Sequence, residues 1–363
     1  MIELKQYGYI ETIPVPDGLI PGRITDHRGS HYTVITRHGE ASAVLKGTYY
    51  HNAELREDFP CVGDFVHIQH NDSGPSLISA LLPRKTMFSR ADFSGHAIGY
   101  VKTVLEQVVA ANFDYVFIMT SLNYDFNVNR IMRYIAQAHQ SRGKPVVILT
   151  KADLVDDYDP LIRSVEKAAP DVPVHAVSAH TGHGLDALSE YFQPGKAIVF
   201  LGMSGVGKSS LLNVLMEQDV MIVKAIRNDD SRGRHTTSHR QLFMLPSGAM
   251  VIDTPGMREL GLFDVDYGIS AGFADVEELV TQCRFSDCLH QTEPKCAIRA
   301  ALNDGSLSSE HWKRYQAMKR ESKFVDSKSS YLREKKDFGK AIAIWSKQRK
   351  RREMHGKQAR DLT

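Results

Sequence analysis

The segment Gly202–Ser209 constrains this chain more than any other, because it reads Gly-Met-Ser-Gly-Val-Gly-Lys-Ser and matches the pattern G-x-x-x-x-G-K-[ST]. It follows the apolar run Ala197–Leu201 and opens the stretch Ser209–Glu217, which has the character of a helix. Glycines in such a loop let backbone N–H groups surround phosphates, while Lys208 supplies positive charge and the Ser209 hydroxyl can bind Mg²⁺. The strand–loop–helix context disfavours the alternative, a glycine-rich turn that binds nothing. The residues expected at the phosphates are Gly202, Met203, Ser204, Gly205, Val206, Gly207, Lys208, Ser209 and Ser210.

A second motif, Asp253-Thr-Pro-Gly256, lies about 45 residues beyond this loop and follows another apolar run. An aspartate at a strand end can hold Mg²⁺, and the Gly256 N–H can reach a γ-phosphate. The intervening segment should supply a threonine that binds Mg²⁺ in one nucleotide state and releases it in the other. Thr237 is favoured over Thr236 for that role, so Ser209, Thr237 and Asp253 are the predicted Mg²⁺ ligands.

Two further motifs predict which base is bound. Thr150-Lys151-Ala152-Asp153 follows the run Pro145–Thr150, and the Asp153 carboxylate can accept both the N1–H and the exocyclic amine of guanine. Ser178-Ala179 follows the next apolar run, where a backbone N–H can meet the guanine O6. Adenine lacks that donor and acceptor pattern, so the sequence predicts a guanine nucleotide rather than ATP. Thr150 stands where many GTPases have asparagine, which leaves one contact to the N7 edge of guanine in doubt.

The order of these motifs is rotated. The base-reading motifs precede the phosphate loop by about 50 residues, whereas in ordinary GTPases they follow it. The same sheet can still form, because chain termini in compact domains often lie close together, so that they can be joined and the chain opened at another loop. Apolar strands alternating with helices such as Phe126–Arg142 and Leu185–Phe192 predict a parallel α/β sheet.

Other parts of the chain predict a multidomain organisation. Residues 1–82 contain five short strand-like segments, for which an OB-like β-barrel is favoured over any other small β-domain. The expected continuation is a linker over 83–104, the permuted P-loop domain over 105–265, a zinc-binding α-helical domain over 266–325 and a basic helical tail over 326–363. The five strand-like segments are Gly22–Asp26, His31–Arg37, Glu40–Lys46, Asp64–Gln69 and Ser76–Leu82.

Three of the four cysteines crowd into one segment with a histidine. Cys283, Cys288, His290 and Cys296 lie within 14 residues, and three thiolates with one imidazole form a closed tetrahedral set typical of a structural zinc site. Buried free cysteines are the alternative. We expect one zinc ion there, and Mg²⁺ with the nucleotide.

Charge is distributed unevenly. Residues 311–363 carry 17 Lys and Arg against 6 Asp and Glu, although the whole chain has a net charge of only +2. A basic tail on an otherwise acidic protein predicts a polyanionic partner, with nucleic acid as the favoured class. No apolar run reaches the roughly 20 residues of a membrane-spanning helix. A cytoplasmic protein is expected, and nothing in the sequence demands more than a monomer.

With these features together, the chain resembles the circularly permuted, small-ribosomal-subunit-dependent GTPases of the RsgA/YjeQ type. The resemblance covers nearly the whole chain and includes the barrel, the motif order and the cysteine cluster. It implies zinc at the four residues of that cluster. It also implies an assembly factor that binds the small ribosomal subunit and ribosomal RNA, and that hydrolyses GTP to GDP and phosphate when bound there.

The catalytic group is the most open of these expectations. Met257 follows Gly256, where Ras-like enzymes place a water-orienting glutamine, and methionine cannot perform that role. His235 is the nearest candidate, and the resemblance also points to it; an exposed loop histidine is the alternative, with the partner then supplying the group. Two other functions compete: an RNA-binding module that uses GTP only as a structural ligand, and a P-loop kinase or ATPase.

Overall fold

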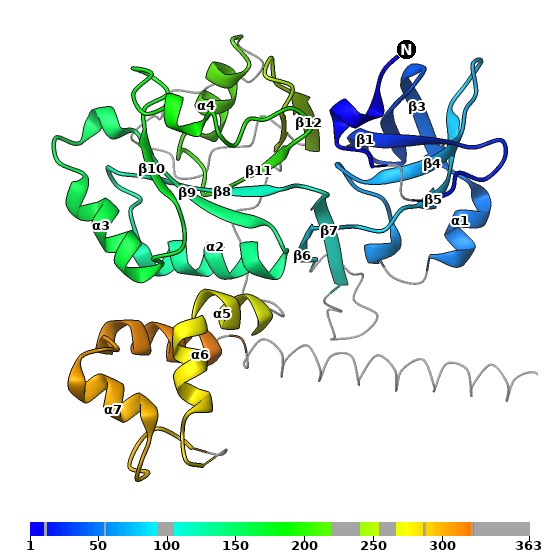
Figure 1. The fold of residues 1–363 in the computed structure, drawn as a ribbon. Coiled ribbons are helices and arrows are strands. Elements are labelled where there is room, and N and C mark those ends of the chain that lie inside the picture. Colours follow the sequence, from blue (N-terminus) through cyan, green and yellow to red (C-terminus); the bar gives the residue numbers. More distant parts are fainter. Residues whose placement is uncertain are drawn as a thin grey trace, which may run out of the picture.

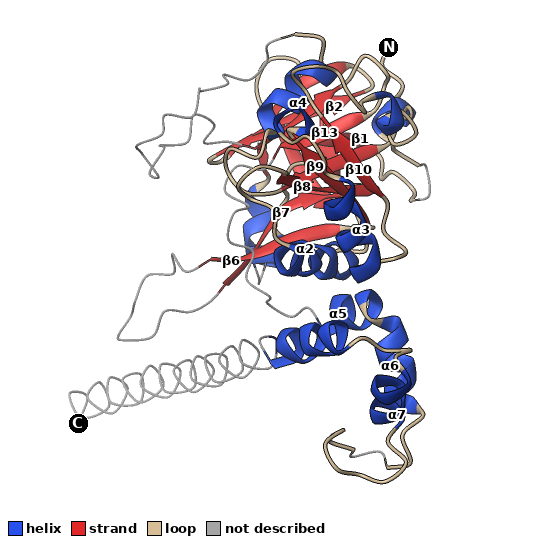
Figure 2. Cartoon of the chain, turned by 90° about the vertical axis from the view of Figure 1, so that its left-hand side faces the viewer, coloured by secondary structure: helices blue, strands red, loops and turns tan. Residues whose placement is uncertain are grey.

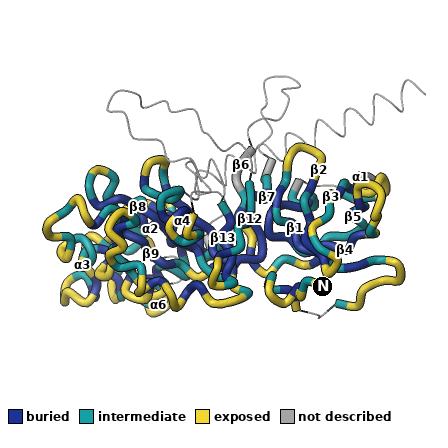
Figure 3. Tube along the Cα trace, turned by 90° about the horizontal axis from the view of Figure 1, so that it is seen from above, coloured by how far each residue is buried: buried dark blue, intermediate teal, exposed yellow. Residues whose placement is uncertain are grey.

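The computed structural model describes residues 1–10, 13–53, 56–92, 105–218, 240–253, 266–285, 288–320 and 322. Within these residues, an N-terminal barrel and a larger α/β domain lie side by side, and a group of helices lies against one face of the α/β domain (Figure 1). Buried residues lie inside both of the first two parts (Figure 3), and one apolar cluster extends through both of them. No helix in the described ranges is both long and apolar enough to cross a bilayer.

The N-terminal domain is a closed five-stranded barrel, as the sequence predicts. Strand β1 pairs with both β2 and β4, and the circuit closes in the order β1-β2-β3-β5-β4. Its interior consists of residues with less than 1% exposure, such as Ile24, Val34, Val66, Ile68 and Ile78. The elements are η1 (Leu4–Tyr7), β1 (Ile20–Arg28), β2 (His31–Thr36), β3 (Gly39–Leu45), α1 (Gly47–Asn52), η2 (Arg56–Asp58), β4 (Phe65–Gln69) and β5 (Ser76–Leu81).

The α/β domain is built on five parallel strands and one antiparallel strand, in the order β10-β9-β8-β11-β13-β12. Helices α2 and α3 cover one face and α4 the other (Figure 2). The near-continuous apolar strands of the sequence are therefore buried from both sides. The elements are β8 (Tyr115–Ser121), α2 (Val128–Gln140), β9 (Lys144–Thr150), η3 (Ala152–Leu154), α3 (Asp159–Ala168), β10 (Val174–Val177), η4 (Asp186–Leu188), β11 (Ala197–Leu201), α4 (Lys208–Leu215), β12 (Arg240–Met244) and β13 (Met250–Asp253).

Local sequence explains where these helices begin and where one fails to form. The Asn127 side chain caps α2 by accepting a 3.0 Å hydrogen bond from the N–H of Arg130. The helix expected over Leu185–Phe192 is only the short 3₁₀ turn η4. Gly184 and Pro194 bound that segment, so too few residues remain to propagate a helix.

The expected linker contains an additional strand. Strand β6 (Met87–Asp92) pairs with β7 (Leu105–Ala111) as an antiparallel ribbon, separate from the main sheet. The main sheet instead continues from the α/β domain into the barrel, because β12 pairs with β1 at Asp26↔Gln241 and His27↔Arg240. Barrel and α/β domain thus share one 11-stranded sheet.

The C-terminal part is helical, as expected. It consists of α5 (Asp266–Gly272), α6 (Ala274–Thr281), α7 (Ala297–Asp304) and a further helix over 309–320, which Ser308 caps through the N–H of His311. Helix α5 packs on α2, which joins this part to the α/β domain (Figure 1). The expected tail helix over 326–363 lies outside the described residues.

Candidate nucleotide site and metal centre

The phosphate-loop motif forms the turn between β11 and α4. Gly205 and Gly207 have φ values of 78° and 102°, in the region that favours glycine. Gly202 is needed for a different reason, because a Cβ there would lie 2.4 Å from the carbonyl oxygen of Met119. The backbone of this loop can therefore take its path only with glycine at these positions.

Lys208 is the first residue of α4, and its side chain turns back towards the phosphate loop. Its Nζ donates hydrogen bonds of 2.7 Å and 2.6 Å to the carbonyl oxygens of Gly202 and Met203. The ammonium group therefore lies at the loop, where the sequence places the phosphates. Ser209 follows on the first turn of α4, with Ser204 and Ser210 on the same loop and helix start.

The guanine-reading motifs follow two neighbouring strands, β9 and β10, at their carboxyl ends. Lys151 adopts a left-handed conformation, with φ 59° and ψ 41°, and this turn leads into η3, which carries Ala152 and Asp153. The fully buried Ser178, just after β10, donates a 2.5 Å hydrogen bond to Oδ1 of Asp153. The structure thus brings together the two motifs that the sequence assigns to the base.

The Ser178 hydroxyl has a role that the sequence analysis did not identify. Besides donating to Asp153, it accepts hydrogen bonds from the N–H groups of His180 and Thr181, at 3.2 Å and 3.1 Å. These contacts shape the turn that contains Ala179 and hold the carboxylate in place. From the sequence, this turn was expected to offer guanine only a backbone contact, and a serine after a strand carries no signal of a side-chain role.

Asp253 is the last residue of β13, whose neighbour β11 leads into the phosphate loop. Asp253 therefore lies at the same edge of the sheet as the phosphate loop that leads to Ser209, and the assignment of both residues to Mg²⁺ stays a prediction. The other predicted participants, Thr237, His235 and Gly256, lie outside the described residues.

The cysteine cluster forms a compact group between α6 and α7. The ligand atoms of Cys283, Cys288, His290 and Cys296 all lie within 4.8 Å of one another, and none of the cysteines is in a disulfide. His290 has a φ of 61°, and its ring packs edge-on against Trp312. Its Nδ1 faces the sulfur atoms, at 3.5 Å from Cys283 Sγ and 3.4 Å from Cys296 Sγ.

These distances fit a tetrahedral metal. Zn–S bonds of about 2.3 Å and a Zn–N bond of about 2.0 Å require sulfur atoms about 3.8 Å apart and a nitrogen about 3.5 Å from each sulfur. The Sγ atoms of Cys283 and Cys296 are 3.9 Å apart. Donor type and spacing therefore both suit a closed zinc site, with Nδ1 as the nitrogen ligand.

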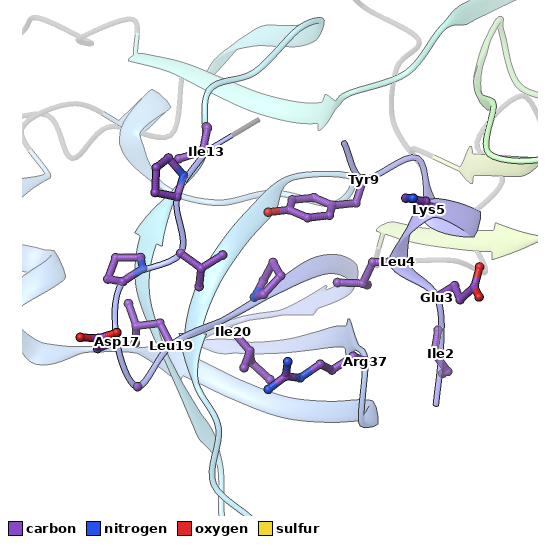
Figure 4. A pocket seen from close by; sticks show the side chains of 15 residues that line it. Ile2, Glu3, Leu4, Lys5, Tyr9, Ile13, Asp17, Leu19, Ile20 and Arg37 are labelled. Carbon is purple, nitrogen blue, oxygen red and sulfur yellow. The ribbon is translucent and has the colours of Figure 1, made fainter. Parts of the chain in front are cut away.

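A separate hollow of about 900 Å³ lies in the barrel domain (Figure 4). The N-terminal segment and the residues leading into β1 line it, among them Leu4, Tyr9, Leu19 and Arg37. None of the predicted nucleotide or metal ligands that the structure describes borders this hollow.

Comparison with known proteins identifies the family. The RsgA GTPase family model matches residues 81–263. This chain belongs to the RsgA GTPase family. It is 41% identical over 339 residues to small ribosomal subunit biogenesis GTPase RsgA 2 of Lactiplantibacillus plantarum, covering 92% of this chain and 94% of that protein. It is 39% identical over 362 residues to RsgA 2 of Vibrio parahaemolyticus, covering 97% and 95%.

Solved structures of this type show the same architecture. YjeQ from Thermotoga maritima is 26% identical and superposes with a TM-score of 0.61, over 83% of this chain and 97% of that one. YloQ, described as a circularly permuted GTPase, gives a TM-score of 0.59 at 23% identity, over 86% and 96%. The family and the permuted motif order predicted from the sequence are therefore confirmed.

Proposed function

We propose that this protein is a GTPase that acts in the late maturation of the small ribosomal subunit and hydrolyses GTP to GDP and phosphate while bound to it. The hydrogen bond between Ser178 and Asp153 carries this proposal, because it holds in place a carboxylate that can accept the two donors of guanine. The same chain contains every residue of the phosphate-loop motif, Gly202–Ser209. The relatives named for small-subunit biogenesis supply the partner. Such a partner places the protein in the cytoplasm, where it acts as a monomer.

In this function, the phosphate loop binds the nucleotide through its backbone N–H groups, and Lys208 neutralises the β- and γ-phosphates. Ser209, Asp253 and Thr237 would hold Mg²⁺, which neutralises charge developing on the phosphates. Asp153 accepts the guanine donors, and the turn after Ser178 supplies an N–H to O6. Most of these residues come after the carboxyl end of a strand in the parallel sheet. Thr237 belongs to the segment that connects two of those strands, β11 and β13.

Hydrolysis should be slow without the partner. Met257 cannot orient the attacking water, so His235 is the candidate for that task when the protein is docked on the subunit. A neutral imidazole can accept a hydrogen bond from water at neutral pH. This arrangement makes turnover dependent on the subunit.

The remaining parts serve attachment to ribosomal RNA. Zinc at the cysteine cluster would hold together a segment too short and polar to fold by apolar burial alone. We expect the contacts with polyanionic RNA to come from the OB-like barrel and from the basic residues of the C-terminal segment, which are Lys347, Arg349, Lys350, Arg351 and Arg352.

The decisive experiment is multiple-turnover GTP hydrolysis by the full chain, with and without purified small ribosomal subunits. We expect slow turnover alone and strong stimulation by subunits, both dependent on Mg²⁺. Large ribosomal subunits are the matched control. Nucleotide competition separates the rivals, because ATP should not displace GTP. A protein that binds GTP tightly but never turns it over with subunits would be an RNA-binding module with a structural nucleotide.

A further inference from the structure

The side chain of Thr150 joins the base-recognition strand to the phosphate loop. Thr150 is the last residue of β9 and is only 5% exposed. Its Oγ1 lies 2.5 Å from the carbonyl oxygen of Val206 and 3.2 Å from that of Thr120. A threonine hydroxyl carries one proton and can make only one full hydrogen bond as a donor. The shorter contact shows that this proton serves Val206, inside the phosphate loop.

The surroundings of Thr150 hold it in this orientation. Its carbonyl oxygen accepts a 3.0 Å hydrogen bond from the N–H of Leu122, so the backbone is fixed next to β8. On the other side, a Cβ at Gly207 would lie 3.8 Å from Oγ1, so the phosphate-loop backbone is in van der Waals range. The Val206 side chain is 1% exposed and belongs to the same core cluster as Met119. Thr150 is therefore packed against the phosphate loop at Val206 and Gly207.

This geometry limits what Thr150 can do for the base. The N7 atom of guanine is a hydrogen-bond acceptor, so a protein group must donate to it. An asparagine amide has two N–H donors and can serve a loop carbonyl and N7 together, whereas the single proton of Thr150 is already used. The remaining lone pairs of its hydroxyl are acceptors and gain nothing from N7.

We propose that Thr150 is a positioning residue that ties the phosphate loop to the end of β9, and that this protein does not use it to read the N7 edge of guanine. The proposal rests on the proposed guanine-nucleotide function and deepens it. Base selection then falls on the other edge of guanine, through Asp153 and the turn after Ser178. The Thr150 hydroxyl thus couples the end of β9, which leads into Lys151–Asp153, to the phosphate loop.

The test compares the binding of GTP with that of 7-deaza-GTP, in which a C–H group replaces N7, using the full chain and Mg²⁺. The native protein should bind the two within about twofold. Thr150→Asn restores a second donor and should favour GTP by roughly fivefold to tenfold. A tenfold preference in the native protein, or no gain in Thr150→Asn, would overturn the proposal. Failure of the native protein to bind GTP at all would instead overturn the guanine site itself.

A second set of variants tests the link to the phosphate loop. Thr150→Val keeps the shape but removes the donor, so both nucleotides should bind more weakly by the same factor, roughly tenfold, and Thr150→Ser should restore them. Thr36→Val is the matched control, because that buried hydroxyl donates a 2.9 Å bond to the carbonyl of Gly39 within the barrel. It should leave nucleotide affinity unchanged. If Thr150→Val binds both nucleotides as tightly as the native protein, the Thr150 hydroxyl does not position the phosphate loop.

Discussion

The hydroxyl of Ser178 donates a 2.5 Å hydrogen bond to the carboxylate of Asp153, and so links the turns that follow two adjacent parallel strands. The same hydroxyl accepts two backbone N–H groups of its own turn. The carboxylate is therefore oriented before any ligand arrives. Such preorganisation lowers the entropy lost on binding, and under the proposed function it favours a base that presents two adjacent donors.

Asp153→Asn should invert the base preference. The amide presents an N–H where guanine also presents N–H, so GTP should lose affinity, while xanthosine triphosphate offers an acceptor there. Sites that hydrogen-bond a substrate group can discriminate by about 10⁴–10⁵-fold, which sets the upper limit of the effect. Competition binding with GTP and xanthosine triphosphate measures it. If the variant binds GTP as well as the native protein, Asp153 does not read the base.

Ser178→Ala should weaken GTP binding without changing which base is preferred. Losing the hydroxyl frees the Asp153 carboxylate to rotate and should reduce affinity roughly tenfold, the value of one net hydrogen bond. Ser189→Ala is a suitable control, because that exposed hydroxyl donates a similar 2.7 Å bond to the carbonyl of Asp186. Equal affinities for the two alanine variants would argue against an orienting role for Ser178.

One equivalent of zinc should copurify with the chain. Cys288→Ser removes one ligand and should lower the bound metal and loosen the helices around the cluster, while the α/β domain keeps its own core and still binds nucleotide. Elemental analysis and thermal unfolding measure both effects. Cys61→Ser, in the barrel, should retain the metal, since that cysteine is remote from the cluster in the fold. Carefully purified native protein without zinc would contradict the assignment.

Much of this molecule could be predicted because its signals are local. The glycines of the phosphate loop, the Asn127 cap of α2 and the alternating strands of the barrel each act over a few residues. The five barrel strands consequently lie close to the five predicted segments. The apolar strands of the α/β domain do so as well. The helix expected over Leu185–Phe192 did not form, because glycine and proline at its ends outweigh the apolar spacing between them.

Long-range relationships could not be predicted from the sequence. Strand β12 was not predicted, because Leu242 is its only buried residue and gives no alternating pattern, and because its pairing with β1 joins residues more than two hundred positions apart. The bonds of Thr150 to Val206 and of Ser178 to Asp153 depend on how neighbouring strands are placed by the sheet. Residue types suggested these positions, but only the fold shows which atoms meet.

His235→Ala should separate binding from catalysis. If His235 positions the attacking water, the variant should keep its affinity for GTP and for small ribosomal subunits but lose most of the stimulated turnover, by about 10²–10⁴-fold. The slow unstimulated rate should change less. Single-turnover hydrolysis with saturating subunits is the measurement. A variant that is stimulated as strongly as the native protein would mean that the partner supplies the catalytic group.

Gly268→Ala should detach the helical C-terminal part from the α/β domain. In α5, a Cβ at this position would lie 1.8 Å from the carbonyl oxygen of Ala136 in α2, so the helices must move apart. The N–H of Gly268 also donates a 3.1 Å bond to the Gln140 side chain. We expect a loss of about 1–3 kcal/mol in the free energy of unfolding. Gly272→Ala is the control, because a Cβ at that position would come no closer than 3.8 Å to its nearest neighbouring atom. Gly305→Ala would not be a matched control, because the positive φ of Gly305 would add backbone strain.

Arg23 joins the barrel to the α/β domain, and its replacement should weaken that junction. This β1 side chain is 1% exposed, and it donates hydrogen bonds to the carbonyl oxygens of Tyr7, Gly63 and Asn112. Asn112 belongs to the turn between β7 and β8, so the guanidinium bridges the two domains. Burial lowers the pKa of Arg23 to about 10, with Asp114 and Asp64 opposing the shift, and the group therefore remains charged at neutral pH.

Arg23→Met keeps the length and apolar stem of the side chain but removes the donor to the carbonyl oxygens of Asn112 and Tyr7. The Gly63 carbonyl keeps a 3.3 Å bond from the Asn112 side chain. Each unsatisfied group costs about 1–3 kcal/mol, so we expect several kcal/mol less stability and separate unfolding of the two domains. Arg37→Met, just after β2, is the control, since its exposed guanidinium bonds to the exposed side chain of His38 and its loss should cost less than about 1 kcal/mol. Chemical denaturation followed by probes in each domain distinguishes the outcomes. If both variants unfold like the native protein, the junction is held by the β1–β12 pairing and the apolar contacts around it, and the guanidinium adds nothing.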